Sequence, residues 1–351
     1  MKSSYTGGLY SFLRFHLGVL AAFYLLGMAI LADAPLSLTV IPQLVVGVLA
    51  GLFVAVGAPG RMEAITCATF VVAIPVQLGF ELDASMVLLS SLLLLHACTP
   101  LAPYGSWTAR GRIDPRGDWH MPTRVWQAQW ILLSAAYAYL GLSSIDSSTS
   151  GLGWLPPSAL IAFGPLALVR KLRPWLWLVF LLGDWLAPLA PLKPDTTPMW
   201  LLFHWFLFDP AWIKPAKRNE HTTVFYDGTC GFCHRSVRFL LSEDAYQNLR
   251  FAPLQGSTFQ ERLDGRDLKI RDSLIVFTPE GRLLDRSDAI IEAMERLGGA
   301  WRVIAIFARI IPAFLRDGWY DLIGRRRMFF FARPKQLCPI LPPDLTSRFL
   351  P

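Results

Sequence analysis

The sequence predicts an α-helical multi-pass membrane bundle of about eight helices, followed by a smaller α/β domain. The 351 residues are 53% hydrophobic, with 13 Trp, 23 Phe and a mean hydropathy of +0.40, which is more apolar than soluble proteins usually are. The long apolar stretches occupy the first two thirds of the chain. The last third alternates short apolar runs with charged residues and carries a Cys-x-x-Cys pair, Cys230 and Cys233.

The apolar stretches are long enough to cross, or nearly cross, a hydrocarbon core of about 30 Å. They fall near residues 12–32, 36–58, 62–80, 84–102, 124–145, 153–169, 174–192 and 197–213. Prolines interrupt the stretch at 153–169, so a re-entrant segment is the alternative there. We expect a transmembrane domain over residues 1–213, a linker over 214–221 and a soluble domain over 222–351.

The distribution of lysine and arginine predicts how the chain faces the membrane, because cytoplasmic loops are enriched in these residues. With eight crossings and a cytoplasmic start, Lys193 is the only basic residue of the membrane part on the outer side. The lipid bilayer is therefore an expected partner, in the cell membrane, with both termini in the cytoplasm. Basic residues beside apolar stretches explain the net charge of +7, so no nucleic-acid partner is expected.

Ionisable side chains at membrane depth are candidate sites, because burying one costs at least about 2.5 kcal/mol on insertion scales. Asp184 lies in the middle of an apolar stretch, and His96 and His204 lie in others. A site made of these residues would act on a lipid or a quinone. The alternative is that each is hydrogen-bonded between helices or lies near an interface.

Three motifs in the membrane part resemble a known family. They are Ser11-Phe-Leu-Arg-Phe-His-Leu-Gly18, the stretch Leu92–Trp107 that ends in Tyr104-Gly-Ser-Trp107, and Trp126-Gln-Ala-Gln-Trp-Ile131 with Tyr137 and Tyr139. They look like the horizontally transferred transmembrane domain related to vitamin K-dependent gamma-carboxylase. That family pattern has a lysine after the fifth helix, where this chain has Ser143–Ser147, so carboxylase chemistry is not expected.

Short alternating elements follow the linker. The pattern predicts strands at 223–227, 248–252, 272–277 and 282–285, with helices at 230–242, 257–264 and 288–297. Ser287 or Asp288 is expected to cap the last of these helices. Strand, helix, strand, helix, hairpin, helix is the order of thioredoxin-like folds, whose active site lies at the first strand-to-helix junction. The Cys-x-x-Cys falls at that junction.

The Asp227-x-x-Cys230-x-x-Cys233 motif resembles that of the DCC-type thiol-disulfide oxidoreductase-like family. The likeness covers nearly all of 222–350 and continues through Arg250–Gln255, Ser287–Ile290, Trp319–Gly324, Arg325–Arg327 and Cys338–Pro339. It implies a protein-disulfide reductase or oxidoreductase that acts on a thiol or disulfide of a protein or small molecule. No cofactor or metal is expected for this activity. No proline precedes the strand at Asp272, where thioredoxins hold substrate backbone with a cis-proline, which puts peptide docking in question.

Each residue of the motif has an expected role. Cys230 would be the attacking thiolate, favoured by the backbone N–H groups and dipole of a helix N-terminus, and Cys233 the resolving thiol. His234 and Arg235 add positive charge, although Arg235 would also fit a solvated face. Asp227 would either relay a proton to or from Cys233 or turn the chain through Asp-Gly.

Other assignments of the cysteines remain open. Cys338 would be a buried thiol, form a second mixed disulfide, or complete a zinc site with Cys230, Cys233 and His234. Zinc binding or redox sensing would suit a membrane scaffold or transporter-like protein. Cys230–His234 also matches the c-type haem attachment pattern, but haem attachment normally takes place outside the cytoplasm.

Two further features lie near the end of the chain. Ser287 and Asp288 at a helix N-terminus would either hold a glutathione carboxylate or only cap the helix. The apolar stretch 301–327 carries arginines at seven-residue spacing, which would place them on one helical face: Arg302, Arg309 and Arg316. Such a helix would pack on the domain's own sheet or dock on the anionic inner leaflet.

Overall fold

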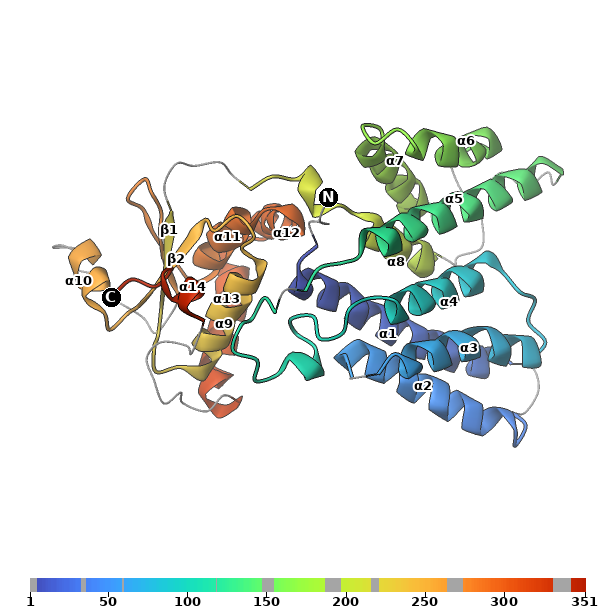
Figure 1. Cartoon of the computed structure of the whole chain (residues 1–351), viewed down its shortest axis with the longest axis horizontal. Coiled ribbons are helices and arrows are strands. Elements are labelled where there is room, and N and C mark those ends of the chain that lie inside the picture. Colours follow the sequence, from blue (N-terminus) through green and yellow to red (C-terminus); the bar gives the residue numbers. More distant parts are fainter. Residues whose placement is uncertain are drawn as a thin grey trace. The chain divides into compact units, whose positions relative to one another are not determined.

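The computed structural model describes residues 5–32, 36–58, 60–117, 119–146, 155–186, 197–215, 221–263, 274–330 and 342–351. The chain divides into two compact units, and Figure 1 labels most of their helices and the strands β1 and β2. Unit 1 comprises Met1–Tyr5, Tyr10–Arg110 and Trp119–Asp209. Unit 2 comprises Thr6–Leu9, Gly111–Asp118 and Pro210–Pro351. The chain is therefore mostly helical, with one small mixed sheet in unit 2.

The α-helices of the first part of the chain coincide with the apolar stretches of the sequence. They are α1 (Gly7–Leu31), α2 (Val40–Val56), α3 (Met62–Gln77), α4 (Ala84–Ala97), α5 (Thr123–Asp146), α6 (Pro157–Ala167), α7 (Arg173–Leu186) and α8 (Thr197–Leu207). Small residues allow α1 and α2 to approach closely, because a Cβ on Gly18 would lie 2.3 Å from the carbonyl oxygen of Gly51. Close backbone approach at small residues is typical of helices that pack in membranes.

Two of the described helices are long and apolar enough to cross a membrane, namely α1 with 25 residues and Thr123–Ile145 of α5 with 23. Helices α2, α3, α4, α6 and part of α7 are apolar but have only 10–17 residues. The 11 residues of α6 span about 16 Å, roughly half of a hydrocarbon core. These lengths give limited support to membrane association, and the eight-crossing topology with cytoplasmic termini stays a prediction.

The sheet of unit 2 has the strand order β2-β1-β3-β4. Its strands are β1 (Thr222–Tyr226), β2 (Leu249–Pro253), β3 (Ile275–Phe277) and β4 (Leu283–Asp285). Strand β1 pairs with β2 in parallel and with β3 antiparallel, and β3 and β4 form an antiparallel hairpin. The order of strands and helices predicted from the sequence is the observed one.

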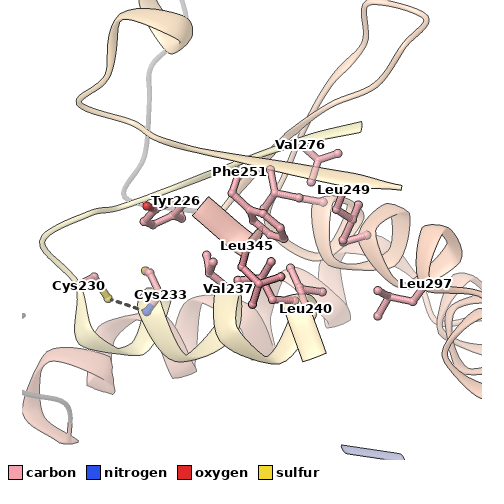
Figure 2. Close-up of a cluster of buried hydrophobic side chains, with 14 residues drawn as sticks. Tyr226, Cys230, Cys233, Val237, Leu240, Leu249, Phe251, Val276, Leu297 and Leu345 are labelled. Atoms are coloured by element: carbon pink, nitrogen blue, oxygen red, sulfur yellow. Dashed lines mark hydrogen bonds between the residues drawn. The ribbon is translucent and has the colours of Figure 1, made fainter. Parts of the chain in front are cut away.

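Alternating side chains of β1 divide the core of unit 2 between the two faces of the sheet. Val224 and Tyr226 belong to the larger cluster, which includes residues of α9 (Gly231–Glu243) and α11 (Arg286–Leu297). Phe225 belongs to the smaller cluster with Phe259 of α10 (Ser257–Leu263). Figure 2 shows the larger cluster, in which Val237 and Leu240 of α9 lie beneath the sheet. Packing on both faces positions the β1–α9 junction.

Helix α11 begins before its predicted cap. Its first residue is Arg286 and the residue in the N-cap position is Asp285, so the expectation that Ser287 or Asp288 caps this helix is wrong. The cause is the immediate succession of β4 and α11: Asp285 ends the strand with extended backbone, and Arg286, with a φ of 48°, turns the chain into the helix. Polar residues near the start of a helix indicate roughly where the helix begins, but they do not identify the exact capping residue.

The single helix expected over 301–327 is also wrong. The chain forms α12 (Gly299–Ile310) and α13 (Ala313–Phe330), which are separated by Ile311 and Pro312. Proline disfavours helical backbone at the residue before it, and the backbone of Ile311 is extended. Arg302 and Arg309 therefore lie on one helix and Arg316 on the next, so seven-residue spacing does not align the three.

The last residues of the chain run beside β2. After α14 (Pro343–Thr346), the amide nitrogen of Phe251 donates to the carbonyl oxygen of Arg348 at 3.0 Å, and that of Leu350 to the carbonyl oxygen of Phe251 at 2.8 Å. The Arg348 guanidinium forms a buried ion pair with Asp244. The C-terminal segment thus covers the outer edge of the sheet.

Candidate functional site

The thiol of Cys230 lies at the N-terminus of α9. Cys230 is the N-cap residue, with extended backbone, and the first helical residue is Gly231. Its sulfur accepts a hydrogen bond from the amide nitrogen of Cys233 at 3.3 Å, drawn as a dashed line in Figure 2. The sulfur therefore occupies the place of a capping oxygen, where backbone N–H groups stabilise a negative charge.

Both thiols of the motif are buried. Cys230 is 1% exposed and Cys233 is 5% exposed, and both pack in the larger core cluster with Tyr226 and Val237. The structure contains them as two thiols rather than as a disulfide. Neighbouring side chains of this cluster therefore cover the Cys230 sulfur.

A hydrogen-bond network holds the loop before Cys230. Asp227 Oδ1 accepts from the amide of Thr229 at 2.9 Å, from the Thr229 hydroxyl at 2.7 Å and from Gln255 Nε2 at 3.0 Å. Gln255 Oε1 in turn accepts from the amide of Gly228 at 3.1 Å. Asp227 thus turns the chain, as one of its two expected roles required, and its role in proton transfer stays a prediction.

Gln255 is a residue of this site that the sequence reading did not single out. It lies at the end of the segment Arg250–Gln255, two residues after β2 ends at Pro253. Parallel pairing of β1 with β2 brings the carboxyl ends of both strands to one edge of the sheet. A polar residue just beyond the carboxyl end of β2 is the signal that would have indicated it.

The neighbours of the thiols on α9 differ in their contacts. His234 contacts the loop through Nε2, 2.9 Å from the carbonyl oxygen of Gly228, and its ring packs edge-on against Tyr226. Because a carbonyl oxygen accepts, Nε2 carries the proton. Arg235 is exposed on the same helix, as expected for a solvated face.

Ser287 and Asp288 at the start of α11 already hold partners from α13. The Ser287 hydroxyl donates to Asp317 Oδ1 at 2.5 Å, and its amide is 3.4 Å from the same oxygen. Asp288 pairs with Arg316 at 2.8 Å. The carboxylate of Asp317 therefore occupies the position at the start of α11 that a glutathione carboxylate would need.

The histidines expected at membrane depth contact aromatic side chains of unit 1. His96 Nδ1 is 2.5 Å from the Tyr10 hydroxyl. The fully buried His204 has Nε2 3.2 Å from the Tyr137 hydroxyl and Nδ1 3.0 Å from the carbonyl oxygen of Trp200. These contacts agree with hydrogen bonding between helices. Asp184 belongs to α7, but its side chain lies outside the described part of the structure.

The zinc alternative involves a residue that the structure does not describe. Cys338 lies outside the described ranges, so its place relative to Cys230, Cys233 and His234 is not known from the structure. Among the described residues, no group of three or more His, Cys, Asp or Glu side chains is arranged to hold a metal ion. Zinc binding that includes Cys338 stays a prediction.

A buried carboxylate in unit 2 was not anticipated from the sequence. Glu243, at the end of α9, is 2% exposed and accepts a hydrogen bond from Trp301 Nε1 at 2.8 Å. It also accepts, within the same unit, from the amide of Gly8 at 2.9 Å. Burial raises the pKa of Glu243 above its ordinary value of 4.5. A charged residue that ends an amphipathic helix gives no sequence signal of burial.

Comparisons with known proteins match the part of the chain that carries the thiols. A family model described as DCC1-like thiol-disulfide oxidoreductase matches residues 224–333. The uncharacterized protein YuxK of Bacillus subtilis is 31% identical over 137 residues, which are 39% of this chain and 98% of the relative. A chloroplastic DCC family protein of Arabidopsis thaliana is 24% identical over 133 residues, which are 35% of this chain and 74% of the relative.

The comparisons add nothing on the first two hundred residues. No solved structure matches the chain. The family model begins at residue 224, and the resemblance of the N-terminal part to the gamma-carboxylase-related domain finds no support in these matches. That resemblance stays an expectation.

Proposed function

Because the chain belongs to the DCC1-like thiol-disulfide oxidoreductase family, we propose that Cys230 and Cys233 cycle between a dithiol and a disulfide in a thioredoxin-like domain. The sheet order β2-β1-β3-β4, with helices on both faces, supports this fold. The protein would be a membrane-anchored oxidoreductase, held in the bilayer by α1, α5 and the shorter apolar helices.

The reaction balances with the two thiols and one substrate disulfide. The Cys230 thiolate attacks one sulfur of the substrate disulfide, forms a mixed disulfide and releases the other substrate sulfur as a thiolate. The Cys233 thiolate then attacks the Cys230 sulfur, closes the Cys230–Cys233 disulfide and releases the second substrate thiolate. Two electrons pass from the dithiol to the substrate, and the reverse sequence oxidises a substrate dithiol.

The position of the Cys230 sulfur carries the proposal. A sulfur that accepts the Cys233 amide at 3.3 Å, at the first turn of α9, lies where a thiolate is stabilised when it attacks and when it leaves. The network of Asp227 and Gln255 supports this by holding the preceding loop. A proton relay through Asp227 remains part of the proposal.

The contacts at the start of β3 favour a small or flexible substrate over a peptide whose backbone is held as in thioredoxin. The amide of Leu274, directly before β3, donates to the Tyr320 hydroxyl at 2.8 Å. Thioredoxins use this part of the fold to hold substrate backbone. Because α13 already engages the Leu274 amide, we propose that substrate is recognised mainly through its sulfur.

A redox titration of the full chain tests the proposal. With Cys338→Ser as the background, maleimide gel shifts in glutathione buffers of graded potential should show a reversible two-thiol transition between about −120 and −270 mV. Cys230→Ser should abolish exchange with a model disulfide, whereas Cys233→Ser should retain the attacking thiol and accumulate the mixed disulfide.

Cys98→Ser is the matched control, since Cys98 is an exposed thiol of unit 1, and it should change neither result. Exchange that survives in Cys230→Ser would contradict the proposal. Thiols that react only after a chelator is added would instead support the zinc-binding alternative.

A further inference from the structure

The hairpin formed by α12 and α13 has large apolar side chains on its outer surface. Phe314 is 74% exposed, Ile310 73% and Trp319 68%. The exposed apolar residues before and after the turn at Pro312 form what we call the apolar hairpin face: Phe307, Ile310, Phe314, Leu315, Trp319 and Ile323. Soluble proteins rarely expose apolar residues in such a contiguous run, and those that do use it for binding.

Helix α13 turns its polar side toward the protein and its apolar side outward, the reverse of a helix on the surface of a soluble domain. Its polar side contacts the rest of unit 2: Arg316 pairs with Asp288, and Asp317 accepts from Ser287. The Tyr320 hydroxyl on the same side accepts from Leu274. The apolar side, with Leu315 and Trp319, faces outward. A surface helix normally buries its apolar stripe and exposes its polar one, so α13 is built for an apolar neighbour.

The charged residues of α13 indicate what kind of apolar neighbour this helix would have. Arg325 and Arg326 are exposed one turn beyond Leu322, and Arg326 follows Trp319 by seven residues, which places both on one side of the helix. Arginines beside aromatic and aliphatic side chains are the composition of helices that lie in the interface of an anionic bilayer. Trp319 suits that interface because its ring is apolar and its N–H is polar.

The upstream arginines make contacts of their own. Arg302 donates to the carbonyl oxygen of Lys214 at 2.6 Å, and Arg309 pairs with Glu295 at 2.7 Å. Arg316, as described, pairs with Asp288. The surface that could contact a membrane is therefore not the line of arginines expected from the sequence. Arg325 and Arg326 would attract anionic groups, and the side chains of the apolar hairpin face would supply the apolar contact.

We infer that the apolar hairpin face inserts into the interfacial layer of an anionic lipid bilayer, with Arg325 and Arg326 at the headgroups. Apolar helices elsewhere in the chain, such as α1, raise the local concentration of bilayer around this face. Helix α13 also packs against α9, so docking brings the helix that carries Cys230 to the lipid surface. The inference does not rest on thiol exchange.

Photo-crosslinking of the full-length protein in lipid nanodiscs tests the inference. Phe314 is replaced by p-benzoylphenylalanine, and Trp319 is replaced in a second variant. Tyr246 is the matched control because it is an aromatic residue of unit 2 that is 50% exposed but lies outside the hairpin. Phospholipid adducts, detected by mass spectrometry, should be several-fold more abundant at 314 and 319 than at 246.

Varying the lipid charge distinguishes docking on an anionic surface from nonspecific hydrophobic contact with lipid. Adding phosphatidylglycerol to phosphatidylcholine discs should increase the adducts at 314, and Arg325→Gln with Arg326→Gln should remove that increase. Arg262→Gln with Arg282→Gln removes the same charge from exposed positions outside the hairpin and should leave it intact.

Three results would overturn the inference. Equal adducts at 246 and 314 would show no preferred lipid contact. Crosslinks from 314 and 319 to a second copy of the chain, or to another segment of the same chain, would make the face a protein interface. Adducts that do not respond to phosphatidylglycerol would exclude the anionic surface. Because the Cys230→Ser variant should crosslink like the parent protein, a failure of thiol exchange would leave these readouts unchanged.

Discussion

Gln255 is the residue that joins the two sides of the candidate active site. Its amide donates to Asp227 and its carbonyl accepts from Gly228, so one side chain from the end of β2 fixes the loop that leads to Cys230. Neither hydrogen bond involves a sulfur. We therefore propose a positioning role for Gln255, because the loop that it holds leads directly to Cys230.

Replacing Gln255 by alanine should slow thiol exchange without removing it. The loop would lose two hydrogen bonds, and a displaced reacting atom lowers rates by about ten- to a hundredfold. The measurement is the second-order rate constant of the reduced protein with a model disulfide. Gln260→Ala, at an exposed position of α10, is the control and should leave the rate unchanged. An unchanged rate in Gln255→Ala would remove the positioning role.

Glu243 makes stability depend on pH, because burial raises its pKa above the ordinary value of 4.5. The folded state then holds a proton that the unfolded state releases, so the free energy of unfolding falls as pH rises from the unfolded pKa through the folded one. The slope in that window is at most about 1.4 kcal/mol per pH unit.

The Glu243→Gln variant cannot release a proton at this position. Thermal unfolding of both proteins should show the parent losing stability relative to Glu243→Gln as pH rises above about 5. Glu261→Gln, which removes an exposed carboxyl group from α10, is the control and should follow the parent. A parent protein that gains stability relative to Glu243→Gln over this range would show that the sign is wrong.

At the scale of elements, the C-terminal segment completes the sheet edge. Arg348 and Asp244 form a buried ion pair, and Asp244 also accepts from the amides of Asn248 and Leu249 at 3.0 and 2.9 Å. The carboxylate therefore holds the α9–β2 connection and the C-terminal segment together. Breaking a buried pair leaves an uncompensated charge, which costs about 3–5 kcal/mol.

Asp244→Ala should therefore lower the free energy of unfolding by about 3–5 kcal/mol. Asp244→Asn combined with Arg348→Met removes both charges and keeps one amide acceptor, so the double variant should lose much less. Urea denaturation measures both values. Glu295→Gln breaks the more exposed pair with Arg309 and should cost about 1 kcal/mol or less. Equal losses in Asp244→Ala and Glu295→Gln would contradict the buried-pair argument.

At the scale of the whole molecule, the eight-crossing topology is the prediction that most needs a test. Alkaline phosphatase fused after residue 195 should be active outside the cytoplasm, and the same reporter fused after residue 218 should be inactive, because arginine and lysine flank the cytoplasmic side. Activity at both positions, or at neither, would show that the last apolar stretch does not cross. Activity only after residue 218 would reverse the orientation.

The β1–α9 junction and the place of its two thiols could be predicted from the sequence alone. Alternating apolar residues, Asp-Gly and the start of a helical pattern are local signals, and local hydrogen bonding decides where a strand ends and a helix begins. Local signals were also misleading. Ser287 or Asp288 was expected to cap α11, whereas Asp285 stands in the N-cap position, and the regular spacing of the arginines gave no indication of the helix break at Pro312.

Which distant residues complete the site depends on how the chain folds. Gln255 reaches Asp227 because β1 and β2 pair in parallel, and Asp317 fills the start of α11 because α13 folds back on it. The inverted orientation of α13 likewise depends on those contacts. A sequence pattern shows that a helix has two faces. Which face turns toward the protein is decided by partners far away in the chain, through packing and hydrogen bonds that no local rule contains.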